Sequence, residues 1–266
     1  MTAKHVLAQM TFREFEQRLP EKPVIILPLG SQEEQGPTAP MGDFMLTEAL
    51  AARVAERCGA IAAPTIPFGY ADHFRAVPGG VQLRAGTFCR LLRDVADNFL
   101  DHGLRHLVIL NGHTGNAPLI DRVARDLRAE RQVLMPSLNL WRLQTAELWE
   151  KAYGVPAKQG FAHGGEPVSS VYAHLFPELM RPDLAERPEN GRRFLGFETA
   201  GTGAIRFGGV EVAMPLNIDE VTGNGMTGGD PAMCSAEAGA QVTEHIVSLC
   251  AEFITRFRAA TASSEG

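Results

Sequence analysis

The chain has 266 residues, a formal net charge of −6 at neutral pH and a hydrophobic fraction of 45%. These values are typical of a globular protein with a sizeable core, and we expect one domain over residues 1–266. The acidic balance and the lack of a basic stretch argue against a nucleic-acid partner, because phosphate binding depends mostly on Lys and Arg.

Apolar runs and helical patterns alternate along the first half of the chain. The run VIILPLG at 24–30 is typical of a short, fully buried strand. Residues 47–58 have the helical period, with Leu50, Val54 and Cys58 on one face and a glycine as the stop. The patterns that follow predict a strand within 60–69, a helix at 87–102, a strand at 106–112, a helix at 117–130 and a strand at 132–140.

The second half of the chain is less regular. We expect a helix at 166–175, a glycine-rich region of loops and β excursions at about 191–229, and a long helix at 235–258. Alternating strands and helices predict a mostly parallel sheet with helices on both faces. The expected fold class is therefore α/β, a three-layer α/β/α sandwich.

The sequence also bears on location. The N-terminal residues lack the apolar core of a signal peptide, and no segment approaches the ~20 apolar residues that span a bilayer. The four cysteines lie far apart in apolar surroundings and form no CxxC pair, which indicates free buried thiols. We therefore expect a cytoplasmic protein without a membrane partner. The cysteines are Cys58, Cys89, Cys234 and Cys250.

Three polar clusters stand where predicted strands end or a predicted helix begins. They are GSQEEQGPTAPMGDF at 30–44, NGHTGN at 111–116 and FAHGGEP at 161–167. In an open α/β sheet, ligands bind beyond the carboxyl ends of the strands, so these loops can converge on one site. Mixed imidazole and carboxylate ligands suit zinc, manganese or iron. The candidate side chains are Glu33, Glu34, Asp43, His113, His163 and Glu166.

Each candidate has a structural explanation when it is taken alone. Glu33 and Glu34 would then be solvated loop residues, and Asp43 would cap the following helix. His113 would occupy an exposed turn, and Glu166 would favour a helix dipole. The combination favours a metal site, because three separate segments place suitable ligand types at the same edge of the predicted sheet.

Two other enzyme classes lack their motifs. No GxSxG elbow is present, which argues against a serine hydrolase of the α/β-hydrolase type. No P-loop or GxGxxG follows a strand, and the glycines of NGHTGN have the wrong spacing for dinucleotide binding.

The polar clusters, in this order, resemble the motifs of the creatininase (creatinine amidohydrolase) family. GSxE…GPxxP at 30–40 is similar to its first motif, and NGHTGN to its NGHGGN. HGGEPVSS at 163–170 is similar to HAGExETS, and GGDPAMCSAEAG at 228–239 to its C-terminal GDPxxASAExG. FGYADHF…PGG at 68–80 resembles the family more loosely. The similarity covers nearly the whole chain.

The resemblance implies a three-layer α/β/α fold and metal-dependent hydrolysis of an amide C–N bond. Of the metals that suit these ligand types, zinc is expected first, with manganese or iron as alternatives, and one or two ions are expected. The resemblance also implies a homohexamer. Carried over to this sequence, the family's metal ligands correspond to Glu33, Asp43, His113 and Glu166. His163 corresponds to a catalytic residue beside the metal, and Glu34 is expected to orient the water or to bind the metal.

The first motif departs from the family pattern ExHGPH, because Gln35 and Thr38 replace its two histidines. Val168 replaces a glutamate of the third motif. A glutamine oxygen is a weaker zinc ligand than imidazole. Two alternatives follow: the centre is reduced to one metal, or Glu34 supplies the missing ligand. Creatinine itself is not the expected substrate.

The expected function is a metal-dependent amidohydrolase that acts on a small cyclic amide or formamide-like substrate. A binding protein that kept the fold and lost the reaction is one alternative. A metal-dependent hydrolase of esters or lactones is the other. The substrate is expected to be a small molecule, whose identity the sequence does not give.

Overall fold

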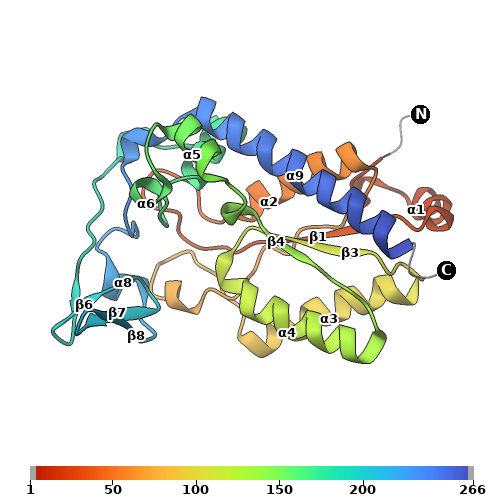
Figure 1. Ribbon diagram of the computed structural model, residues 1–266, viewed down its shortest axis with the longest axis horizontal. Coiled ribbons are helices and arrows are strands. Elements are labelled where there is room, and N and C mark those ends of the chain that lie inside the picture. The colour runs from red at the N-terminus through yellow and green to blue at the C-terminus, as the bar shows by residue number, and fades with distance from the viewer. Residues whose placement is uncertain (1–3, 263–266) are drawn as a thin grey trace.

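The computed structural model describes residues 4–262. Its centre is a four-stranded, parallel sheet in the order β2-β1-β3-β4. Helices cover both faces of this sheet, which confirms the predicted α/β/α sandwich (Figure 1). The strands are β1 (Ile25–Leu29), β2 (Ile61–Ala62), β3 (Leu107–Asn111) and β4 (Ser137–Asn139).

The larger helices pack on the sheet, and shorter helical turns connect the elements. The α-helices are α1 (Phe12–Arg18), α2 (Phe44–Cys58), α3 (Ala85–Asp101), α4 (Ala117–Arg131), α5 (Ala146–Tyr153), α6 (Ala157–Gly160), α7 (Val168–Leu175), α8 (Ile218–Val221) and α9 (Ala236–Ala262). The 3-10 turns are η1 (Leu7–Gln9), η2 (Leu19–Glu21), η3 (Asp72–Phe74), η4 (Thr114–Asn116), η5 (Leu140–Arg142), η6 (Pro177–Leu179), η7 (Pro182–Leu184) and η8 (Pro231–Met233). Across residues 4–262, no helix has the length and apolar character needed to cross a bilayer.

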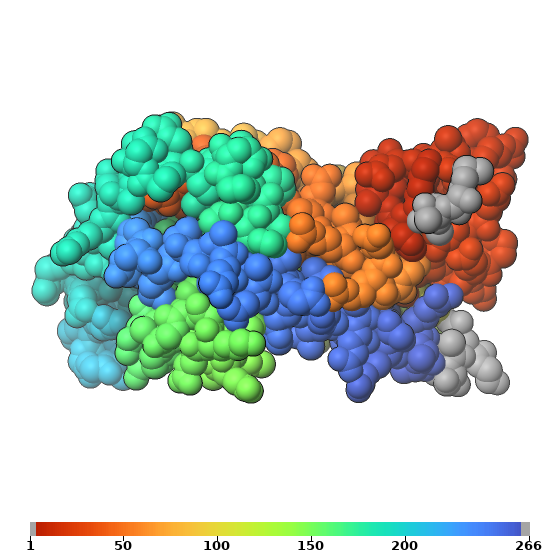
Figure 2. Space-filling view, turned by 90° about the horizontal axis from the view of Figure 1, so that it is seen from above, coloured from red at the N-terminus to blue at the C-terminus, as the bar shows by residue number. Residues whose placement is uncertain are grey.

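The core consists of two apolar layers, one on each face of the central sheet. Successive side chains of a strand point to opposite faces. Ile26 and Val108 therefore pack with α2, α7 and α9, whereas Ile25 and Ile109 pack with α3 and α4. Figure 2 shows α9 in blue across one side of the molecule, between α2 in orange and α5 in green. The long C-terminal helix thus closes one layer of the sandwich.

Most predicted elements occur close to their predicted positions, with three corrections. The helix expected from residue 166 begins at Val168, so Glu166 precedes it by two residues. The run 60–69 forms only the two-residue strand β2, since Pro64 and Pro67 lack the N–H that continued pairing requires. The run 132–140 contributes only the three residues of β4.

The glycine-rich region forms a second sheet, which we call the β-arm. Its four antiparallel strands pair in chain order. The β-arm extends from the end of the molecule opposite to α1 (Figure 1). The predicted β excursions are therefore present. The strands are β5 (Arg193–Phe194), β6 (Phe197–Thr199), β7 (Ala204–Phe207) and β8 (Val210–Ala213).

Candidate metal centre

The first loop of the site leaves β1 and closes on itself before α2 begins. Asp43 occupies the N-cap position of α2, but its carboxylate turns back to Ser31. It accepts hydrogen bonds from the backbone N (2.6 Å) and Oγ (3.1 Å) of that residue. A Cβ on Gly30 would stand 2.4 Å from Cα of Phe44, so the two ends of the loop meet only around a glycine. Asp43 is thereby held beside the end of β1.

The second loop follows β3, the neighbour of β1. The backbone N of Gly112 donates to the carbonyl of Leu29 (2.8 Å), which joins the ends of the two strands. Nδ2 of Asn111 donates to the carbonyl of His113 and to Oδ1 of Asn139, both at 2.7 Å. These bonds fix the turn that carries the His113 ring.

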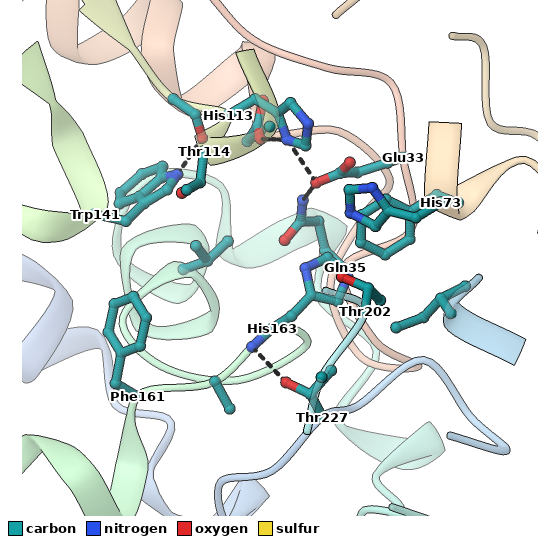
Figure 3. Close-up of a pocket in the computed structure, with 18 of the residues that line it drawn as sticks. Glu33, Gln35, His73, His113, Thr114, Trp141, Phe161, His163, Thr202 and Thr227 are labelled. Atoms are coloured by element: carbon teal, nitrogen blue, oxygen red, sulfur yellow. Dashed lines mark hydrogen bonds and ion pairs between the residues drawn. The ribbon is translucent and has the colours of Figure 1, made fainter. Parts of the chain in front are cut away.

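The two loops bring Glu33, Asp43 and His113 together at the carboxyl edge of the sheet. Nδ1 of His113 lies 3.0 Å from Oε1 of Glu33 and 3.4 Å from Oδ2 of Asp43. One ligand atom from each residue lies within 4.8 Å of the other two. All three residues are buried, and Figure 3 shows the His113 ring facing Glu33. Three of the four residues predicted as metal ligands therefore form one group.

Two buried carboxylates make this place favourable for a positive charge. Burial lowers the pKa of His113, but Glu33 and Asp43 outweigh this effect and hold the pKa well above its usual range. Burial raises the pKa of Asp43 to about 6. Burial alone would raise the pKa of Glu33. The charge and the hydrogen bond of His113 together outweigh this effect, so the pKa of Glu33 lies below its usual value. The group thus favours an ionised Glu33 next to a cation.

The donor set fits a divalent metal ion. Among the described residues, Oε2 of Glu33 is buried without a hydrogen-bond partner, and such an oxygen is costly unless a cation binds it. Nε2 of His113 lies 3.1 Å from the carbonyl of Tyr70. A carbonyl only accepts, so Nε2 carries a proton, and Nδ1 is the nitrogen that faces the two carboxylates and can bind an ion once it has lost its own proton. Glu33, Asp43 and His113 together offer the mixed oxygen and nitrogen ligands that zinc, manganese and iron bind.

A second ionisable pair, Glu34 and His163, lies next to this group. Nε2 of His163 is 2.7 Å from Oε1 of Glu34, and Oε2 of Glu34 accepts from the backbone N of Gly36 (2.7 Å). The ring of His163 also lies against Phe74, with centroids 4.4 Å apart. Burial lowers the pKa of His163, but the hydrogen bond and charge of Glu34 raise it more, and the net pKa is above its usual value. Glu34 therefore faces His163, which argues against its use as a substitute ligand.

Glu166 lies outside the group of three candidate ligands. Its Oε2 accepts hydrogen bonds from the Tyr153 hydroxyl (3.0 Å) and the Ser170 backbone N (3.2 Å). Burial raises the pKa of this carboxyl. The structure thus places Glu166 in the pocket wall, where the start of α7 and α5 hold it.

Gln35, which replaces a family histidine, contacts the ligand group but is not one of its members. Its Nε2 donates to Oε1 of Glu33 at 3.2 Å. An amide nitrogen is a donor and cannot ligate a cation, so this orientation supports the carboxylate of Glu33 from one side.

One pocket with a volume of about 410 Å³ is lined by Glu33, Gln35, Asp43, His113, His163 and Glu166. Several other side chains of the pocket were not predicted from the sequence. Trp141 and Phe161 stand on the side away from Glu33 and His73 in Figure 3. The position of Trp141 directly after β4 is a signal that was available, because β4 ends at the same edge of the sheet. The missed pocket residues include His73, Phe74, Trp141, Arg142, Phe161, Thr202 and Thr227.

The fold and the site define an α/β/α protein with a carboxylate–imidazole cation site at the carboxyl edge of a parallel sheet. The profile of one family, Creatininase, described as creatinine amidohydrolase, matches residues 8–254. The chain belongs to this family.

Similar proteins include a 3-dehydro-scyllo-inosose hydrolase of Thermotoga maritima, 32% identical over 180 residues. That match covers 66% of this chain and 58% of the relative, so less than two thirds of the relative's length is matched. A creatinine amidohydrolase of Pseudomonas putida is 29% identical over 205 residues, 69% of this chain and 76% of the relative. A solved structure entitled "Creatininase Mn" is 24% identical with a TM-score of 0.78, covers 95% of this chain and 98% of its own, and supports the fold.

Proposed function

We propose that the protein is a metal-dependent amidohydrolase that cleaves the C–N bond of a small cyclic amide or formamide-like substrate. One observation carries the proposal: the buried group of Glu33, Asp43 and His113 opens into the same pocket as His163, which is paired with Glu34. Family membership supports it, because the profile is described as creatinine amidohydrolase.

In this proposal Glu33, Asp43 and His113 hold the ion. A divalent metal, when bound, polarises a carbonyl and lowers the pKa of water. His163 donates a proton to the leaving nitrogen, and Glu34 holds the ring in place and stabilises its charged form. The reaction consumes one water: its hydroxyl adds to the acyl carbon, the C–N bond breaks, and the nitrogen leaves with a proton.

We assign the site one zinc ion, with manganese or iron as alternatives. Gln35 in place of a family histidine supports a single ion, since its amide nitrogen faces Glu33. The position of Glu166, hydrogen-bonded to Tyr153 and Ser170, also supports a single ion. We assign Glu166 to the pocket wall and not to metal coordination.

The proposed function predicts that the protein, purified without chelators, carries about one divalent ion per chain. It should hydrolyse a member of a screen of cyclic amides and formamides. Removal of the ion with a chelator should stop the reaction, and added zinc should restore it. Elemental analysis and chromatographic detection of the products provide the measurement. A metal-loaded protein that hydrolyses only lactones or esters would be the related hydrolase, and one that hydrolyses nothing would be a binding protein.

We also propose a homohexamer, for which the β-arm offers a contact surface. Leu195, Phe207 and Val210 are 77%, 64% and 61% exposed there, and such apolar exposure is typical of protein–protein contacts. Replacing Phe207 and Val210 with serine should lower the mass measured by light scattering. Phe12→Ser is the control, because Phe12 is 72% exposed on α1, at the other end of the molecule. A monomeric wild type at micromolar concentration would contradict the hexamer.

We propose a cytoplasmic location for the protein. All four cysteines are free, as expected in a reducing compartment.

A further inference from the structure

Arg142 reaches the pocket through the turn that follows β4. Strands β3 and β4 run parallel and side by side, so the residues after each strand emerge at the same edge. Nε1 of Trp141 donates to the carbonyl of Gly112, which ties this turn to the loop of His113. Arg142 follows immediately and lines the pocket. Its backbone position is therefore fixed relative to the ligand group.

The side chain of Arg142 has an aromatic neighbour and no acidic one. Its guanidinium carbon lies 5.9 Å from the centroid of the Phe161 ring, a cation–π distance that leaves the N–H groups of the guanidinium available. Within residues 4–262, no carboxylate is recorded as an ion-pair partner of Arg142, whereas the exposed Arg57 pairs with Glu244 at 2.5 Å. Arg142 is exposed where it lines the pocket, so its guanidinium is solvated there and can pair with a ligand.

Arg142 differs in charge from the other ionisable residues that line the pocket, which are carboxylates or histidines. Of the pocket-lining residues, all of which the structure describes, Arg142 is the only Lys or Arg. A divalent ion would balance the carboxylates of Glu33 and Asp43. Glu166 accepts hydrogen bonds from Tyr153 and Ser170, and burial raises the pKa of its carboxyl. Arg142 is therefore the one permanently charged cation that the pocket lining offers to a ligand beside the metal site.

We propose that the substrate of this pocket is an amide that also carries a carboxylate, and that Arg142 binds this carboxylate. The proposal rests on the amidohydrolase function and adds the charge class of the substrate. The planar guanidinium matches a carboxylate with two parallel N–H···O bonds, a geometry that lysine cannot reproduce.

The arrangement of the pocket sets the layout of such a substrate. Trp141 and Phe161 stand on the side away from Glu33 in Figure 3, and Arg142 is the neighbour of both. The carboxylate then lies at the end of the molecule remote from the amide that is cleaved. A volume of about 410 Å³ is within the range of small-molecule sites, and an N-formyl amino acid combines the required groups.

A pair of ligands that differ only in this charge tests the proposal. The zinc-loaded protein is titrated in a calorimeter with N-methanesulfonyl-phenylalanine and with its carboxamide, whose sulfonamide group is not hydrolysed. We expect the wild type to bind the carboxylate at least about tenfold more tightly than the carboxamide. In Arg142→Met the preference should fall to about twofold or less, and Arg142→Lys should keep part of it.

The control is Arg128→Met, which removes an exposed arginine of α4 that does not line the pocket. This variant should keep the preference of the wild type. Equal binding of the two ligands by the wild type, no binding of the carboxylate, or an unchanged preference in Arg142→Met would each overturn the assignment.

Hydrolysis of N-formylphenylalanine and its carboxamide by the same proteins separates this proposal from the proposed function. If the enzyme cleaves both, kcat/KM should show the same preference for the carboxylate and the same loss in Arg142→Met. If no variant cleaves any amide while the binding preference holds, the amidohydrolase function fails and the carboxylate site stands.

Discussion

Replacement of His113 with alanine is expected to empty the metal site and to stop hydrolysis. The imidazole supplies the only nitrogen of the described ligand group, and Nδ1 faces both Glu33 and Asp43. Two buried carboxylates alone bind a zinc-type ion more weakly than the mixed set. We expect less than about a tenth of the wild-type metal content and a loss of activity of the order of a thousandfold, which corresponds to about 4 kcal/mol of barrier.

The matched control is His73→Ala, which removes the same ring from the wall of the same pocket. It should keep the ion, because His73 is outside the ligand group. Elemental analysis after gel filtration measures the metal content, and circular dichroism shows that each variant is folded. Full metal occupancy in His113→Ala would remove His113 from the assignment.

The fold could be predicted because its central elements carry strong patterns. The apolar runs at β1 and β3 have no competing explanation, and α3 and α4 keep their helical period throughout. Several short helices were missed, and among them α1 and α5 each have a local start signal. Thr11 and Glu14 form a capping box before α1, and Thr145 accepts from the backbone N of Leu148 at the start of α5. Helices of seven or eight residues carry too few periods for the apolar pattern alone.

The sequence predicted those residues of the candidate site whose positions are set by the ends of strands. Glu33 and Asp43 lie in the loop after β1 and His113 in the loop after β3, so the order of the sheet brings them together. Glu166 was expected in the same group, but its place depends on hydrogen bonds to Tyr153 and Ser170 that no spacing encodes.

The rest of the pocket is made by tertiary packing. Thr202 enters it from the β-arm, and His73 enters from the turn η3. No periodicity or local motif links these segments to the loops of the site. Their convergence follows from the packing of the whole chain, which a single sequence does not reveal.

Replacement of His163 with asparagine should preserve the fold and the bound metal and slow turnover by about a hundredfold or more. Asparagine keeps a polar amide near the position of Nδ1, but it does not reach the Nε2 position that meets Glu34 and cannot exchange a proton near neutral pH. The backbone N of His163 is held by Oγ1 of Thr227 at 3.1 Å, so the loop keeps its anchor in the variant. The loss should therefore appear in kcat, with metal content unchanged.

Glu34→Gln provides the comparison, because it removes the charge beside His163 and retains an oxygen that can accept a hydrogen bond. If Glu34 holds and stabilises a proton-transferring imidazole, this variant should lose less activity than His163→Asn.

The other possible results for His163→Asn each point to a different role of the ring. Unfolding of His163→Asn would assign the ring to packing against Phe74, and loss of the ion would make His163 a ligand. A variant that keeps its fold, its metal and full turnover would show that His163 takes no part in the reaction. The proton for the leaving nitrogen would then have to come from another pocket residue, such as the imidazole of His73.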